Sequence, residues 1–162
     1  MLPIHTILHP TDFSERSGYA LPLACALARD YRARLVMLHV AMSPTIAYGE
    51  GVVPAEPEAF LREAREQLNR LECPDVNDRL ERRFEEGEPA AEILRVAKEI
   101  AASLIVMGTH GRTGLSRLLM GSVAERVVRT APCPVLTVKA PFPGMAAECA
   151  PVEGRVAEPA VP

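Results

Sequence analysis

The chain has 162 residues and a formal net charge of -3, with 48% hydrophobic and 24% charged residues. That length and balance are typical of one globular domain with its own core. Aromatic residues reach only 4% and tryptophan is absent, so the chain lacks both the stacking residues and the basic charge of a nucleic-acid binder. With neither a basic leader nor an apolar run of membrane-spanning length, we expect a cytoplasmic protein without membrane attachment.

The four cysteines are widely scattered and contain no CxxC pair; they are Cys25, Cys73, Cys133 and Cys149. This spacing gives no support to a zinc site or a redox motif. We therefore expect reduced thiols, as is usual in cytosolic proteins.

The first elements alternate between strand and helix patterns. Residues 4–9 predict a strand, and Ser14 is a candidate N-cap for the helix after it. Pro22 lies inside that helical pattern, so the helix either bends there or begins properly only near that residue. Residues 34–40 are mostly apolar, which is typical of a central strand in a parallel sheet. His5, His9 and His39 are interpreted as strand residues hydrogen-bonded within or beside the core.

A long loop over residues 41–57 precedes an amphipathic helix predicted for residues 58–71. Residues 79–85 alternate charged and apolar side chains, which indicates a strand at the edge of a sheet. Pro89 suits the first position of a helix that runs to residue 101. Residues 140–162 are rich in proline and alanine, and we expect an extended or disordered tail there.

The stretch Leu104–Lys139 carries the strongest functional signal. A short apolar run ends at Gly108, a glycine-rich loop follows, Gly121-Ser122 begins a helical pattern, and a second apolar run closes the stretch. Glycine lets a backbone approach a ligand closely, and the N–H groups at a helix start point at negative charge. We therefore expect these residues to hold nucleotide phosphates. The two commonest phosphate motifs, GxxxxGK[ST] and GxGxxG, are absent.

Strands that alternate with helices predict an α/β fold, with a parallel sheet and helices on both faces. Ligands of such folds lie beyond the carboxyl ends of the strands, where the strand order reverses. The strand ends at Pro10 to Asp12, at Val40 and at Met107-Gly108 would meet in one crevice if their strands are neighbours.

The spacing Gly108-x2-Gly111-x9-Gly121-Ser122, together with HPTDFS after the first strand and LHV in the second, resembles the universal stress protein family, specifically its nucleotide-binding branch. The likeness covers residues 3–139, within a predicted domain of residues 1–139. It implies a Rossmann-like, three-layer fold with an open five-stranded parallel sheet in the order 3-2-1-4-5. It also implies ATP binding, and a homodimer through the last strand at Val135, Leu136 and Val138.

The same resemblance assigns the site. Asp12 and Val40 would flank the adenosine, and Pro10 and Met107 would add apolar walls. The phosphates would be held by Gly108, His110, Gly111, Gly121, Ser122 and Val123, with Arg112 placed to reach phosphate oxygens. Mg²⁺ would be held through the phosphates, because no cluster of Asp and Glu offers a metal cage.

Other interpretations stay open from the residues alone. The glycines could serve tight turns and close helix packing, Asp12 could only cap the first helix, and Ser122 could be only a helix-start residue. The leading hypothesis is a stress-response or signalling protein that holds ATP. A slow ATPase and a dimeric scaffold that needs no nucleotide are the alternatives, and no general base other than His110 is evident for catalysis.

Overall fold

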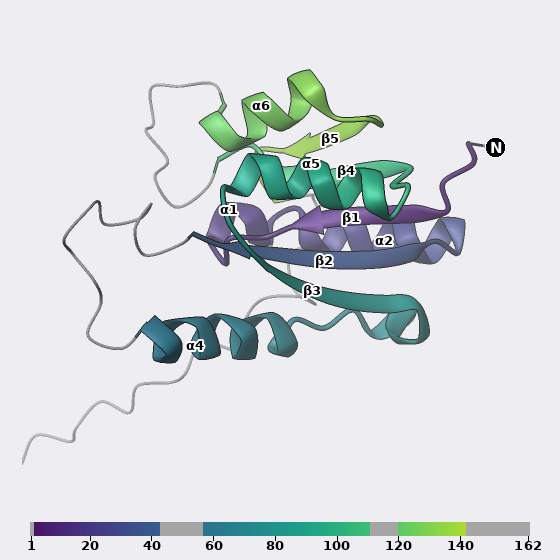
Figure 1. Ribbon diagram of the computed structural model, residues 1–162. Coiled ribbons are helices and arrows are strands. Elements are labelled where there is room, and N and C mark those ends of the chain that lie inside the picture. Colours follow the sequence, from purple (N-terminus) through teal and green to yellow (C-terminus); the bar gives the residue numbers. More distant parts are fainter. Residues whose placement is uncertain (1, 43–56, 111–119, 142–162) are drawn as a thin grey trace, which may run out of the picture.

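A five-stranded sheet in the order β3-β2-β1-β4-β5 organises the protein. The structure is a computed structural model that describes residues 2–42, 57–110 and 120–141 (Figure 1). Its elements in chain order are β1 Thr6–Pro10, α1 Glu15–Gly18, α2 Leu21–Tyr31, β2 Arg34–Ala41, α4 Pro57–Arg70, the 3₁₀ helix η1 Pro74–Arg79, β3 Leu80–Glu86, α5 Pro89–Glu99, β4 Leu104–Gly108, α6 Ser122–Thr130 and β5 Val135–Val138. Every strand pairing is parallel, so the predicted fold class and strand order are confirmed.

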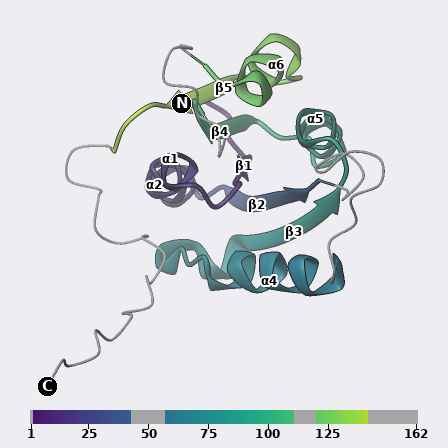
Figure 2. The same ribbon diagram turned by 90° about the vertical axis from the view of Figure 1, so that its left-hand side faces the viewer.

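Both faces of the sheet are covered, as Figure 2 shows with α1 and α2 on one side and α5 on the other. Successive strand residues point to opposite faces. Leu35 and Met37 of β2 therefore pack in a core with α2 and the end of α4, while Val36 and Leu38 pack in a second core with α5 and α6. Two covered faces require apolar residues at almost every strand position, which explains the apolar run of β2.

The proline in the first helical region marks a break. Ser14 caps α1 and accepts a hydrogen bond from the Ser17 backbone N–H. A separate helix, α2, then begins at Leu21, with Pro22 in its first turn, where a missing N–H costs nothing. The structure thus confirms the second of the two possibilities, a helix that starts near Pro22.

The strands β3 and β5 form the two edges of the sheet, which confirms the edge prediction for residues 79–85. The amphipathic helix predicted for residues 58–71 is α4, and it buries Ala64 and Leu68. No pattern in the sequence indicated η1. Most of the long loop and of the tail lies outside the described residues, so a boundary between residues 1–139 and a tail of residues 140–162 stays a prediction.

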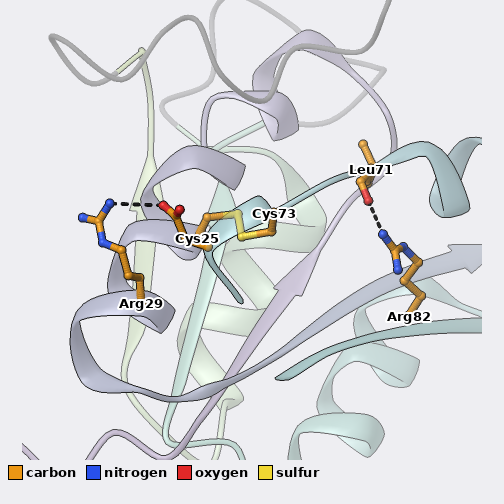
Figure 3. The surroundings of a disulfide bond; sticks show 6 residues. Cys25, Arg29, Leu71, Cys73 and Arg82 are labelled. Carbon is orange, nitrogen blue, oxygen red and sulfur yellow. Dashed lines mark hydrogen bonds and ion pairs between the residues drawn. A yellow bond between two sulfur atoms is a disulfide. The ribbon is translucent and has the colours of Figure 1, made fainter. Parts of the chain in front are cut away.

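The expectation of reduced thiols is wrong for one pair of cysteines. Cys25 in α2 and Cys73 before η1 form a disulfide, with their Cα atoms 5.8 Å apart (Figure 3). The two residues are separated by 48 positions, and the packing of α2 against η1 brings them together. Cys133 is a free thiol, and burial raises its pKa.

In the described ranges, no helix combines the length and the apolar character needed to cross a membrane.

Candidate functional site

The strand order reverses between β1 and β4, because the chain builds outward from β1 to β2 and β3 on one side and later to β4 and β5 on the other. The pairing of β1 with β4 extends to Leu8 and Ile105, whereas β1 pairs with β2 as far as Pro10. Ligands in open α/β folds bind beyond the carboxyl ends of the strands at such a reversal. The candidate site therefore lies at the carboxyl ends of these strands, which face the viewer in Figure 2.

The loop after β1 is shaped by its own side chains. Asp12 Oδ1 accepts hydrogen bonds from the Ser14 backbone N–H at 3.1 Å and from Ser14 Oγ at 2.6 Å. Thr11 Oγ1 accepts from the Phe13 N–H at 3.1 Å and lies 3.1 Å from Ser17 Oγ. These bonds hold Phe13 in the left-handed region, with φ of 61°. Asp12 thus holds the residue that caps α1 but is not the cap itself, because the N-cap is Ser14. Asp12 lies just beyond the carboxyl end of β1.

His39 and Phe13 fix this loop to β2, which the sequence did not indicate. The His39 Nδ1 lies 2.8 Å from the Thr11 carbonyl oxygen, and the rings of His39 and Phe13 stack with centroids 4.2 Å apart. His39 is buried, as predicted for a strand histidine. The stack and this contact hold the Asp12 loop against the end of β2, where Val40 follows His39.

His9 is also buried, and it bridges β1 and β4. Its Nδ1 lies 2.9 Å from the Val106 carbonyl oxygen, so the ring nitrogen donates there, as the prediction required. Burial lowers the pKa of His9 from 6.5 to about 4, against smaller opposing effects of the Val106 bond and the Asp12 charge. His9 is therefore a neutral core residue at neutral pH. His5 precedes β1 and is exposed, so the same prediction is wrong for it.

Gly108 ends β4 where α1 crosses it. A Cβ atom at Gly108 would lie 2.7 Å from the Arg16 carbonyl oxygen and 3.2 Å from the Ser17 Cα. Both atoms belong to the backbone of α1, so a side chain at this position would displace the helix. Close helix packing alone accounts for this glycine, which was one of the open interpretations.

Thr109 connects three elements at the site. Its N–H donates to the Val138 carbonyl oxygen of β5 at 3.1 Å, and its own carbonyl oxygen accepts from the Gly121 N–H at 2.8 Å. These bonds set the start of α6 beside the end of β4. The sequence does not indicate this role of Thr109, because both bonds are made by its backbone. The neighbouring His110 is buried, with Nδ1 3.1 Å from Thr109 Oγ1.

Gly121 is the N-cap of α6 and makes no side-chain cap. The first N–H groups of a helix have no acceptor within the helix, which applies here to Ser122 and Val123. The positive end of the helix dipole lies at the same place. Ser122 is exposed, and Val123 packs partly against the core. The helix start is therefore equipped to attract an anion.

The remaining predicted residues are apolar. Pro10 and Met107 are buried, and Val40 is half-buried at the end of β2. The structure brings nine of the predicted site residues to strand or helix ends at the same edge of the sheet: Pro10, Asp12, Val40, Met107, Gly108, His110, Gly121, Ser122 and Val123. Gly111 and Arg112 lie outside the described residues. No group of acidic, histidine or cysteine side chains within the described part of the chain is arranged to hold a metal ion.

An open parallel sheet wound in both directions from its centre, with the Asp12 loop and the start of α6 both at the carboxyl ends of its strands, defines a Rossmann-like α/β protein. A sequence model of the Universal stress protein family matches residues 3–139. The chain belongs to that family.

Individual relatives match over most of their length. The chain is 39% identical to universal stress protein MJ0531 of Methanocaldococcus jannaschii over 139 residues, which cover 83% of this chain and 82% of the relative. The solved structure of MJ0577 from the same organism is 30% identical, with a TM-score of 0.66 over 86% of this chain and 99% of that one. A universal stress protein solved in complex with cAMP is 26% identical, with a TM-score of 0.56 over 84% of this chain and 97% of that one.

Proposed function

We propose that this protein binds an adenine nucleotide, specifically ATP, at the carboxyl edge of the sheet, and that it holds the nucleotide without needing to consume it. One observation carries the proposal: Thr109 joins the end of β4 to Gly121 and so sets the N-terminus of α6 at the same edge as the Asp12 loop. A helix N-terminus attracts phosphate, and a carboxylate accepts hydrogen bonds from ribose hydroxyls. A nucleotide bound there would have its phosphates at the start of α6 and its ribose at Asp12, on either side of the point where the strand order reverses.

The adenosine would lie against Asp12 and Val40, with Pro10 and Met107 as apolar walls. The phosphates would lie against Gly108, His110, Gly121, Ser122 and Val123, and against Gly111 and Arg112 outside the described residues. Mg²⁺ would accompany the nucleotide on its phosphates, as Mg²⁺ commonly keeps most of its water and few protein ligands. The cAMP complex of a relative supports an adenine nucleotide as the ligand class.

Family membership supports a role in a stress response or in signalling in the cytoplasm. We further propose a homodimer through the last strand. β5 is an edge strand, and Leu136 on it and Val128 on the neighbouring helix are exposed apolar residues. An unpaired edge with apolar side chains is suited to symmetric pairing with a second copy through Val135, Leu136 and Val138.

Calorimetric titration with Mg-ATP tests the binding proposal. The Gly121 backbone, at φ -72° and ψ 154°, is a conformation that any residue adopts, so Gly121→Val places a branched side chain at the phosphate position without backbone strain. We expect at least a tenfold loss of affinity, about 1.4 kcal/mol. The matched control is Thr130→Val, an exposed position at the other end of α6, which should bind as the wild type does.

A wild-type protein that gives neither heat nor a thermal shift with ATP would overturn the proposal. If Gly121→Val bound ATP with the affinity of the wild type, the start of α6 would not be part of the binding site. Turnover of bound ATP that disappears in His110→Ala would instead make the protein a slow ATPase.

A further inference from the structure

The segment that joins α4 to β3 is weakly attached to the rest of the protein. We call residues 72–78 the 72–78 connection. Its side chains are exposed except for Cys73 and Val76. Val76 breaks the helical geometry of η1, and Cys73 provides no side-chain cap. A short irregular segment with two buried anchors is expected to open locally more easily than the sheet does.

The disulfide is the strongest of the few links between this segment and α2. Cys73 is fully buried and Cys25 is 9% exposed, so the bond that joins them (Figure 3) lies below the protein surface. An ion pair between Arg29 Nη1 and Asp75 Oδ2 at 3.4 Å also links the segment to α2, and both side chains are more than half exposed. Exposed ion pairs contribute little, so the covalent bond dominates the attachment.

The end of α4 is held separately. Arg82 Nη2 of β3 donates to the Leu71 carbonyl oxygen at 2.5 Å, and Leu68 packs in the core beneath the helix. Opening the disulfide would therefore leave α4 on the sheet and leave Val76 as the remaining buried anchor of the 72–78 connection, which loosens its attachment to α2. On α2, Leu21, Ala24 and Ala28 are buried in the core independently of the bond, so we expect α2 to keep its place on the sheet when the bond opens.

We propose that Cys25 and Cys73 are a reversible redox pair, opened by a dithiol reductant and closed by a peroxide, which fixes or loosens the 72–78 connection. The inference rests on the cytoplasmic location proposed above, because disulfides that form in a reducing compartment are commonly redox-sensing. The Cα separation of 5.8 Å allows the bond without backbone movement. This inference does not depend on nucleotide binding.

Both directions are ordinary sulfur chemistry. In opening, a thiolate of the dithiol attacks Cys25 Sγ, the S–S bond breaks, and Cys73 leaves as a thiolate that takes up a proton. The second thiol of the reductant then displaces Cys25, which is also protonated, and the reductant ends as its own disulfide. In closing, one cysteine thiolate attacks a peroxide oxygen to form a sulfenic acid and water. The second cysteine displaces a second water as the S–S bond forms.

Peptide mapping and hydrogen exchange on the folded, full-length protein test the proposal. Dithiothreitol under native conditions should remove the cross-linked peptide containing Cys25 and Cys73, and hydrogen peroxide should restore it. In the reduced protein, amides of the 72–78 connection, such as Val76, which donates to the Cys73 carbonyl oxygen, should exchange about tenfold faster or more. Amides of β1 should keep their rates.

Matched variants make the result specific. Cys25→Ala and Cys73→Ala should each show the fast exchange without any response to reductant, and Cys133→Ala should respond as the wild type does. Three results would each overturn the proposal: a cross-link that dithiothreitol opens only after urea has unfolded the protein, an exchange rate at residues 72–78 that does not change on reduction, or a reduced protein in which peroxide does not re-form the bond. The wild-type measurements decide the question even if an alanine variant fails to fold.

Discussion

Replacing Gly108 with alanine tests whether that glycine is required by helix packing. The added Cβ would lie 2.7 Å from the Arg16 carbonyl oxygen, whereas carbon and oxygen normally approach no closer than about 3.3 Å. Because the contact is with backbone, α1 must shift by roughly 0.6 Å or more. Overpacking of this kind costs about 1–3 kcal/mol. Alanine also reduces the conformational entropy of the unfolded chain, which stabilises the folded state by roughly 0.4–1 kcal/mol and offsets part of that cost. We expect a net destabilisation of about 1–2 kcal/mol.

Urea unfolding followed by circular dichroism measures this change, and Gly18→Ala is the matched control. A Cβ at Gly18 meets no atom within 4 Å, and Gly18 ends α1 without a left-handed backbone. That variant should gain about 0.4–1 kcal/mol, so the two glycine replacements should differ in sign. A Gly108→Ala protein as stable as the wild type would refute the packing argument. If that protein also bound ATP more weakly, Gly108 would serve the ligand instead.

Three further predictions concern other parts of the fold. Because burial lowers the pKa of His9 to about 4, the unfolded chain binds a proton more readily, and stability should fall by roughly 3 kcal/mol as the pH drops from about 6.5 to 4. Denaturation of His9→Asn, whose amide can still donate to the Val106 carbonyl oxygen, should show a smaller decrease over that range, and an equal decrease would contradict the assignment. Ser14→Ala removes the cap of α1 and should cost about 1 kcal/mol in urea unfolding, and no loss would show that Asp12 alone holds the turn. Light scattering should show a smaller assembly for Leu136→Lys at the β5 edge but not for Phe60→Lys, a similarly exposed residue on α4, and equal behaviour of the two would argue against pairing through β5.

The sequence predicted the features that depend on local pattern. Apolar runs identified the buried strands, Ser14 and Pro89 marked helix starts, and alternating charge identified β3 as an edge. Each of these signals is carried by residues within one element, so no knowledge of the packing was needed. The strand order was implied by the family resemblance, and the structure bears it out.

Features that depend on packing between distant segments could not be predicted. The disulfide joins Cys25 to Cys73 across 48 positions, and the stack of Phe13 on His39 requires the β1 loop to fold over β2. The role of Gly108 depends on how closely α1 crosses β4. None of these contacts leaves a periodic signal. The same holds for Thr109, which works through backbone bonds that any residue except proline could make.

The small molecules that the protein carries through purification give the sharpest test of nucleotide binding. Native mass spectrometry of protein purified without added nucleotide, followed by identification of the released ligand, should find ATP at up to one molecule per chain, with its phosphates intact. Protein that carries no nucleotide and takes up none when millimolar Mg-ATP is added would contradict the proposal that this chain is a holder of ATP.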